Sequence, residues 1–462
     1  MLKIHNTISR EKEAFNPIHK NEVSLYYCGP TVYWTQHIGN LRGALCTDLT
    51  VRTLKYLGYD VKYVRNYTDV GHLTSDSDLG VDKMEKASER EKLDPLKIAQ
   101  KYIKIYEEDT SELNLLEPDV KPLATEHIQE MQDMIKTLVD KKFAYVTDLA
   151  IYFNVSKAKN YTCLSGQVLE ANISGAGAGD ISDPQKKSPH DFALWFFRAG
   201  THKNALQYWP SPFNSAQTEN GNGFPGWHIE CSAMSKKHLG NTIDIHLGGI
   251  EHIPIHHTNE IAQSENANDA KFVNYWMHNE HLLVDNKKMA KSEGTSYSLE
   301  EIKAKGFQPL ALRFLFSQAH YRSKLNFTWE SLQAAQNGFN HLCEKVINLD
   351  KASKPKVDND FKNQFKDALQ DDFNIPEALA IAHKLLKSNL SDALKYGTII
   401  DFDKVLGLNL AYCNKKEISE GLKDKINALI IERDQARKNK DWEKADKIRY
   451  ELTKFKVSIE DK

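Results

Sequence analysis

Apolar and polar positions near the start of the chain follow a strand, helix and strand pattern. A mostly apolar run from Val23 to Cys28 predicts a strand, and apolar residues at helical spacing follow it until Gly58. Residues 61–67 are rich in β-branched and aromatic side chains, which is typical of a second strand. This order of elements predicts a doubly wound α/β domain with a parallel sheet as its core.

The pattern then changes twice. Residues 95–140 place apolar side chains at helical spacing, 143–155 alternate like strands, and the glycine-rich segment 174–179 indicates a loop. Apolar runs that are typical of strands in a parallel sheet occur again at 242–246, ahead of a glycine pair, and at 272–277. We therefore expect an insertion between two halves of one sheet.

A helical region is predicted from about Glu330 onward. Apolar residues there recur at spacings of three and four, and strand-like patterns thin out. The last residues carry mixed charges on helical patterns around Ala445, Ile448 and Leu452. Such a charge run is typical of a solvated helix face.

Composition narrows the class of protein. The chain has 462 residues, of which 40% are hydrophobic and 27% are charged, as in ordinary soluble globular proteins. It contains no run of about 20 apolar residues and no apolar secretory leader, so we expect a cytoplasmic protein without a membrane partner. Six scattered cysteines form no disulfide framework, which fits a reducing compartment. The net charge of -2 shows no overall basic bias, so any nucleic acid would have to bind at local patches of the surface.

The first candidate site is His37-Ile38-Gly39-Asn40, between the first strand and the first helix. A helix N-terminus offers unpaired backbone N–H groups that suit a nucleotide phosphate, and Gly39 permits close approach. His37 and Asn40 would add side-chain donors. The alternative is an ordinary polar helix entry capped by His37.

A second candidate is the basic segment from Lys287 to Gly294, which follows the last strand-like run. Lys288 and Lys291 are three residues apart and could place positive charge against a triphosphate leaving group. A solvated basic turn is the alternative for this segment.

The chain also contains side chains of the kinds that bind zinc. Cys28, Cys231, His256 and Glu260 supply thiol, imidazole and carboxylate groups. His256 and Glu260 are four residues apart in a segment that reads as a helix entry, so they can point the same way. No spacing here is a recognised cysteine-pair signature, and buried structural thiols are the alternative.

Two further features could contact a substrate. Trp227 could stack on a substrate, although a tryptophan often fills a core. The pair Gly248-Gly249 could let an adenine or ribose lie against the backbone. An ordinary tight turn is the alternative for the glycine pair.

Taken together and in this order, these segments resemble the cysteinyl-tRNA synthetases, a family of class I aminoacyl-tRNA synthetases. The resemblance covers nearly the whole chain and rests on the segments 28–33, 63–66, 226–234, 256–263, 274–278 and 371–379.

The resemblance implies an activity and a set of site residues. It implies ATP-dependent attachment of L-cysteine to tRNA-Cys through a cysteinyl-adenylate, with one Zn²⁺ per chain and with Mg²⁺ bound to ATP, in a monomer. It implies a Rossmann-type catalytic domain with an inserted connective domain, followed by an all-α bundle. By the same resemblance the catalytic residues are His37, Asn40, Lys288 and Lys291; ATP contacts are His37, Gly39, Asn40, Gly248, Gly249 and Lys291; substrate contacts are Gly29, Thr31, Thr68, Trp227 and Glu251; and the metal ligands are Cys28, Cys231, His256 and Glu260.

The same comparison divides the chain into six parts. The expected parts are a first catalytic half (1–110), a connective insertion (111–225), a second catalytic half (226–285), a second-signature and stem-contact region (286–330), an anticodon-binding bundle (331–414) and a small basic helical region (415–462).

Three positions depart from the family pattern. By the resemblance, residues 37–40 are the family's first signature and residues 288–292 its second. Asn40 replaces the usual His of the first signature, Ala290 replaces a hydroxyl residue of the second, and Glu251 replaces an Asp. An amide can donate a hydrogen bond but cannot become cationic. The departures at Asn40 and Glu251 therefore concern contacts to the nucleotide and to the substrate amine.

Two rival functions remain open from the sequence. One is a ligase that joins cysteine to a small amine by the same adenylate chemistry, and the other is a non-catalytic zinc-containing RNA-binding protein. The long helical extension after Glu330 favours tRNA over a small amine as the acceptor.

Overall fold

The computed structural model describes residues 1–71, 83–167, 183–289, 294–351, 356–413, 420–439 and 441–454. The chain forms two compact units, Met1–Ala411 and Tyr412–Lys462. The loop expected at 174–179 and the candidate residue Lys291 lie outside the described residues.

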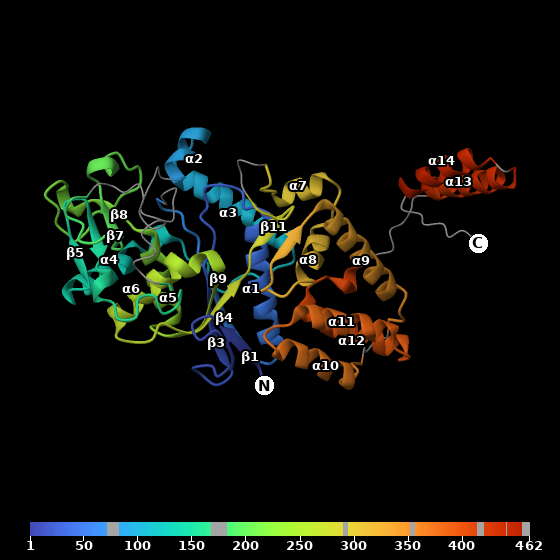
Figure 1. Ribbon diagram of the computed structural model, residues 1–462, viewed down its shortest axis with the longest axis horizontal. Helices are drawn as coiled ribbons and strands as arrows, with labels where there is room; N and C mark the ends of the chain where they lie inside the picture. Colours follow the sequence, from blue (N-terminus) through green and yellow to red (C-terminus); the bar gives the residue numbers. More distant parts are fainter. Residues whose placement is uncertain are drawn as a thin grey trace. The chain divides into compact units, whose positions relative to one another are not determined.

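A four-stranded parallel sheet forms the core of the first unit, in the order β10-β9-β3-β4 (Figure 1). Its strands are β3 (Glu22–Tyr27), β4 (Asp60–Arg65), β9 (Ile243–Gly249) and β10 (Val273–Asn279). The parallel sheet, the two early strands and the two late strands are confirmed. One boundary was wrong: β9 continues through the glycine pair, because Gly249 still pairs with Asn279 of β10.

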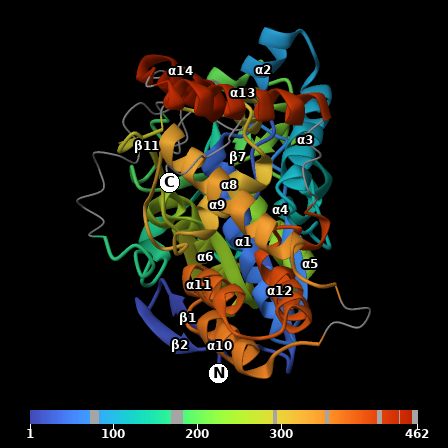
Figure 2. The same cartoon turned by 90° about the vertical axis from the view of Figure 1, so that its right-hand side faces the viewer.

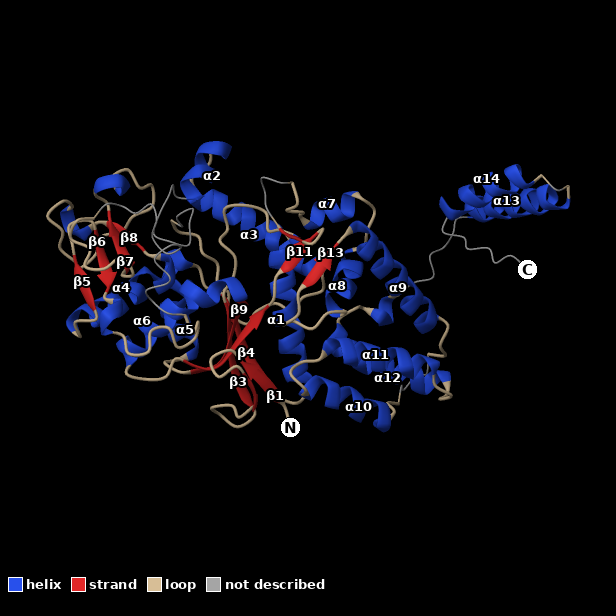
Figure 3. Cartoon of the chain, in the orientation of Figure 1, coloured by secondary structure: helices blue, strands red, loops and turns tan. Residues whose placement is uncertain are grey.

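Helices cover both sides of this sheet. Helix α1 (Ile38–Tyr56) lies on one side, and α5 (Trp227–Leu239) and α6 (Thr258–Asn268) lie on the other (Figures 1 and 3). Helix α1 ends where predicted, because Gly58 has a φ of 98°, a conformation that a glycine adopts without strain. The strand order reverses between β3 and β9, so their carboxyl ends open the crevice where doubly wound sheets bind ligands.

An insertion between β4 and β9 carries helices and a separate antiparallel sheet. Its helices are α2 (Lys83–Glu91), α3 (Pro95–Glu112) and α4 (Ile128–Asp140), and its strands are β5 (Ala144–Val146), β6 (Ala150–Phe153), β7 (Phe192–Phe197) and β8 (Gly223–Pro225), in the order β5-β6-β7-β8. Helices in 95–140 and strands in 143–155 are confirmed. All six residues of β7 are buried, and this strand had no counterpart among our predicted elements.

Two smaller sheets also belong to the first unit. An N-terminal hairpin pairs β1 (Lys3–Asn6) with β2 (Glu11–Ala14), and a second small sheet joins β11 (Leu282–Val284), β12 (Lys287–Lys288) and β13 (Leu325–Phe327). Lys288 therefore lies on a short strand rather than in a free loop.

Helices continue the first unit after β12; α7 and α8 precede the helical region predicted from about Glu330, and α9 to α12 lie within it. The helices are α7 (Leu299–Ala304), α8 (Pro309–Ser317), α9 (Trp329–Ile347), α10 (Asn359–Gln370), α11 (Ile375–Lys387) and α12 (Asp392–Leu406). Figure 2 shows α10, α11 and α12 grouped beside α1, and α1 contacts both α8 and α12. The buried Arg313 of α8 makes the link to α1, since its guanidinium lies 2.7 Å from the Asp48 carboxylate.

In the described part of the second unit, α13 (Glu420–Lys438) and α14 (Trp442–Lys454) pack against each other. Ala445, Ile448 and Leu452 are buried in this pair, as their helical spacing predicted.

The structure also bears on membrane association and cysteine chemistry. None of the described helices combines the length and apolar character needed to span a bilayer. Among the described cysteines, Cys28, Cys46, Cys163 and Cys231 have free thiols.

Candidate functional site

A cavity of about 460 Å³ opens at the carboxyl ends of β3 and β9, where the strand order reverses. Most of the predicted site residues within the described part of the chain line it: Cys28, Gly29, Thr31, His37, Gly39, Asn40, Thr68, Trp227, Cys231, Gly249, Glu251, His256 and Lys288. The fold therefore brings together segments that are more than 200 residues apart in sequence.

Two predicted residues lie behind the cavity wall rather than in it. Glu260 is fully buried behind His256, which does line the cavity. Gly248 is covered by histidine rings, since a Cβ on it would lie 2.5 Å from a carbon of His257. Of the glycine pair, Gly249 is thus the one that reaches the cavity.

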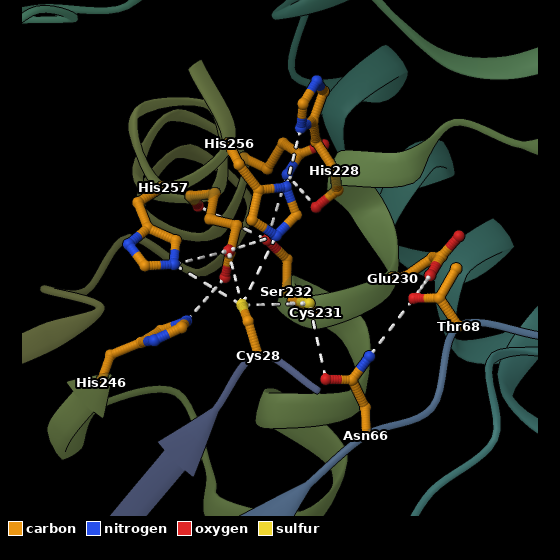
Figure 4. Close-up of polar contacts among 12 residues, drawn as sticks. Cys28, Asn66, Thr68, His228, Glu230, Cys231, Ser232, His246, His256 and His257 are labelled. Atoms are coloured by element: carbon orange, nitrogen blue, oxygen red, sulfur yellow. Dashed lines mark hydrogen bonds and ion pairs between the residues drawn. The ribbon is translucent and has the colours of Figure 1, made fainter. Parts of the chain in front are cut away.

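Four predicted metal ligands meet at one buried point (Figure 4). Cys28 follows β3, Cys231 lies in α5, His256 lies in the wide turn that precedes α6, and Glu260 lies in α6. The Cys28 sulfur is 3.5 Å from the Cys231 sulfur and 3.5 Å from His256 Nε2. One ligand atom from each of the four residues lies within 4.8 Å of the others. Two thiols, an imidazole and a carboxylate at this spacing can hold one divalent ion.

A second possible ligand group shares two members with the first. His246 and His257 join Cys28 and Glu260, again with ligand atoms within 4.8 Å of one another. His246 Nε2 lies 2.9 Å from Glu260 Oε2, and His257 Nε2 lies 3.5 Å from the Cys28 sulfur. Our sequence analysis missed both histidines. His246 lies in the middle of β9 and His257 directly follows His256, and these positions were the signal that could have found them.

These buried side chains shift one another's pKa values. Hydrogen bonding from Cys28 lowers the pKa of the Cys231 thiol to about 6, against the effect of burial. Burial raises the pKa of Cys28. Burial opposes charge on His256, but the Glu260 carboxylate and Cys231 together outweigh it and raise the pKa of His256 to about 10. A cation that replaced these protons would compensate the charges of a thiolate and a carboxylate that are both removed from water.

The first signature caps helix α1. His37 is the N-cap residue, and its Nδ1 accepts a hydrogen bond from the backbone N–H of Asn40 at 3.2 Å. In a neutral ring this acceptor role leaves the proton on Nε2, so His37 can act as a hydrogen-bond donor through that atom. The capped helix start and the donor together favour an anion in the cavity.

The second signature touches the first. A Cβ added to Gly39 would lie 2.1 Å from the Met289 side chain, so Met289 packs directly against Gly39. On the far side of the undescribed residues, the backbone N–H of Ile38 donates to the Tyr297 carbonyl at 2.8 Å. Lys288 is exposed and lines the cavity. Met289 and Tyr297, on the two sides of residues 290–293, thus both contact the start of α1.

The floor of the cavity beside Cys28 depends on a close backbone approach. The Gly29 N–H donates to Asn66 Oδ1 at 2.9 Å, and a Cβ at Gly29 would lie only 1.7 Å from the Asn66 carbonyl oxygen. Thr31 pairs with Thr68, whose hydroxyl donates to the buried Glu230 carboxylate at 2.7 Å. Our sequence analysis missed Asn66, although its place just after β4 puts it at the same sheet edge as Cys28.

Trp227 and Glu251 line the cavity from other sides. The Trp227 ring stacks on the His256 ring, with centroids 4.3 Å apart and planes 19° apart. The Glu251 carboxylate is half exposed and lies 3.6 Å from His281 Nδ1. Trp227 therefore covers a predicted metal ligand, while Glu251 leaves a negative charge accessible at the cavity.

The chain matches two family models. A model described as "tRNA synthetases class I (C) catalytic domain" matches residues 14–337. A model described as "Cysteinyl-tRNA ligase anticodon binding domain" matches residues 419–462. The second match falls in the small region predicted at 415–462, not in the bundle at 331–414 to which we assigned anticodon binding.

Similar proteins extend over the full chain. The cysteine–tRNA ligase of Treponema denticola is 41% identical over 100% of this chain and 98% of its own length. Cysteine–tRNA ligase 1 of Burkholderia lata is 43% identical over 100% of this chain and 95% of its own.

Among solved structures, Mycobacterium tuberculosis methionyl-tRNA synthetase with methionyl-adenylate has a TM-score of 0.54 at 12% identity, over 84% of this chain and 90% of that one. A ternary complex of Agrobacterium radiobacter LeuRS with tRNA has a TM-score of 0.60 at 10% identity, over 87% of this chain and 86% of that one. These structural neighbours share the fold.

Proposed function

Because the chain belongs to the cysteine–tRNA ligase family of class I aminoacyl-tRNA synthetases, we propose that it attaches L-cysteine to tRNA-Cys at the expense of ATP. The observation that carries this proposal is one cavity lined both by Cys28, Cys231 and His256 of the buried metal-ligand set and by the capped start of α1. The first feature fits selection of a thiol, and the second fits a nucleotide phosphate.

The reaction has two steps and needs no nucleophile from the protein. The cysteine carboxylate attacks the α-phosphorus of Mg²⁺-bound ATP, and the bond to pyrophosphate breaks. A hydroxyl of the terminal tRNA ribose then attacks the carbonyl of the adenylate, and AMP leaves. The protein's contribution is to position the reactants and to stabilise charge on the phosphates.

Three groups of side chains serve the nucleotide in this proposal. The α1 N-terminus with His37, Gly39 and Asn40 receives the phosphates, and Gly249 lets the nucleoside approach the backbone. Lys288 and Lys291 meet the negative charge that moves onto pyrophosphate. The cavity lining by His37, Asn40 and Lys288 supports these roles.

In this proposal the four buried metal-ligand side chains select cysteine as the substrate. We propose one Zn²⁺ held by Cys28, Cys231, His256 and Glu260, which fit it in donor chemistry and in spacing. When bound there, zinc supplies a Lewis-acid site that prefers a thiolate sulfur to a serine hydroxyl. In this proposal Gly29, Thr31 and Thr68 shape the adjacent floor and Glu251 meets the substrate amine, which its lining of the cavity supports, while Trp227 stacks on His256.

The proposal also covers the acceptor substrate, the oligomeric state and the cellular location. We propose tRNA-Cys rather than a small amine as the acceptor, and a monomer in the cytoplasm. The match of residues 419–462 to an anticodon-binding model supports the tRNA, since a small amine offers no anticodon.

The test is cysteine-dependent exchange of pyrophosphate into ATP, followed by charging of tRNA-Cys with labelled cysteine by the full chain. We expect exchange with cysteine and transfer to tRNA-Cys. Exchange together with transfer to an amino sugar, and none to tRNA-Cys, would support the small-amine ligase. The absence of any exchange would support a binding protein without catalysis.

A further inference from the structure

Gln36 immediately precedes the first signature and is nearly enclosed. Its side chain is 7% exposed, yet it lines the same cavity as His37 and Asn40. It lies in the loop between β3 and α1, one residue before the N-cap of α1. Burying a side-chain amide without hydrogen bonds is costly, so the partners of Gln36 explain why it is tolerated there.

Its hydrogen bonds fix which way the Gln36 amide points. Nε2 donates to the backbone carbonyls of Thr31 at 3.2 Å and of Trp34 at 3.1 Å. Carbonyl oxygens can only accept, so a flipped amide would place Oε1 against two acceptors. Oε1 must therefore face the other way, toward Asn40.

The orientation of Gln36 in turn dictates that of Asn40. Gln36 Oε1 accepts a hydrogen bond from Asn40 Nδ2. Since Oε1 can only accept, the amide nitrogen of Asn40, and not its oxygen, must face Gln36. The backbone carbonyls of the loop thus set the orientation of an exposed signature side chain through one buried glutamine.

This matters because the chain carries an amide at this signature position. The two ends of an asparagine side chain have nearly the same shape but opposite hydrogen-bonding roles. A flip of Asn40 would present an oxygen lone pair where an N–H is needed, and two oxygens that only accept repel each other. Held by Gln36, the amide keeps one N–H engaged and has its second N–H in a defined direction.

We propose that Gln36 is a positioning residue for the nucleotide reaction, because it fixes the Asn40 amide in the orientation that lets Nδ2 donate to a phosphate oxygen of ATP. The proposal rests on the proposed function. Gln36 itself does not contact the reacting atoms; it acts through Asn40.

A double-mutant cycle tests this coupling in the full chain. The four proteins are the wild type, Gln36→Met, Asn40→Ala and the double variant, and methionine keeps the volume of the buried side chain. The readouts are the ATP dissociation constant, which needs no cysteine, and the kcat and KM of cysteine-dependent pyrophosphate exchange. We expect Gln36→Met to weaken ATP binding or slow exchange about threefold to tenfold, the effect of losing one hydrogen bond. In the Asn40→Ala background the same change should alter either value by less than about twofold.

The opposite pattern identifies a purely structural role. If Gln36→Met costs the same factor in both backgrounds, the glutamine only stiffens its loop and the proposal is overturned. The proposal also fails if Gln36→Met leaves both readouts of the otherwise unchanged chain unaltered. If the wild type binds ATP but shows no cysteine-dependent pyrophosphate exchange, the proposed function is contradicted instead. The double-mutant cycle measured through the ATP dissociation constant still decides the role of Gln36.

A matched control comes from α9. Gln336 is also buried and also bonds an asparagine four residues later, since its Nε2 lies 3.0 Å from Asn340 Oδ1. Gln336 is not among the residues that line the cavity. We expect Gln336→Met to leave ATP affinity and exchange unchanged at a temperature where all variants are folded.

Discussion

His37 combines two roles that substitution can separate. Its Nδ1 caps α1 by accepting from the Asn40 backbone N–H, and its Nε2 is left as the donor of the neutral ring. Asparagine is a good N-cap residue whose oxygen can replace Nδ1, but it has no donor at the position of Nε2. Glutamine reaches that position with an N–H but is a poor cap. The pair His37→Asn and His37→Gln therefore tests the cap and the donor one at a time.

The expected magnitudes differ by role. Loss of an N-cap costs about 1 kcal/mol, so His37→Gln should lower the melting temperature by about 2 °C. Loss of a donor to charge that develops on a phosphate costs about 2.7–4 kcal/mol, or about 10²- to 10³-fold in kcat. His37→Asn should thus melt like the wild type and lose most of its exchange activity, while His37→Gln should melt earlier and keep more activity.

The assay is cysteine-dependent pyrophosphate exchange, with melting followed by circular dichroism on the same samples. A His37→Asn variant that exchanges pyrophosphate within about threefold of the wild type would exclude a donor role for His37 Nε2. That role is also excluded if the two variants rank in the opposite order of activity.

Three further substitutions test other parts of the site. Lys291→Ala should slow adenylate formation with little change in the KM for cysteine; an unaltered exchange rate would exclude its role. Cys231→Ser should lose zinc and cysteine selectivity together, and full metal content by atomic emission would count against it as a ligand. Gly29→Ala would place a Cβ 1.7 Å from the Asn66 carbonyl oxygen, so the backbone must shift, the melting temperature should fall and the KM for cysteine should rise. A melting temperature and a KM equal to those of the wild type would contradict that close approach.

The sequence predicted the parts of the fold that local patterns encode. The strand from Val23, the helix that stops before Gly58 and the later strands have a clear apolar period, and the structure has them as β3, α1, β9 and β10. The strand β7 is six apolar residues without alternation, and we predicted no element there. Its apolar, aromatic character was a usable signal, but periodicity alone does not separate a buried strand from a buried helix.

The sequence predicted which residues form the site better than it predicted how they are arranged. Cys28, Cys231, His256 and Glu260 were singled out by residue type and resemblance, and the structure brings them together. His246 and Gln36 were missed, because their partners Glu260 and Asn40 become informative only once the side chains are placed. Pairing of β3 with β9 joins segments about 220 residues apart, and nothing in the local sequence specifies that register. The boundaries of the six predicted parts stay predictions.

The central claim is that a thiol-selective metal group and a nucleotide site share one cavity. Its most direct test compares cysteine with serine as the substrate of pyrophosphate exchange, in purified enzyme whose zinc content is measured on the same sample. The account predicts one zinc per chain and a kcat/KM for cysteine that exceeds that for serine by a factor on the order of 10⁴ or more. Active enzyme without metal, or equal activation of serine and cysteine, would contradict it.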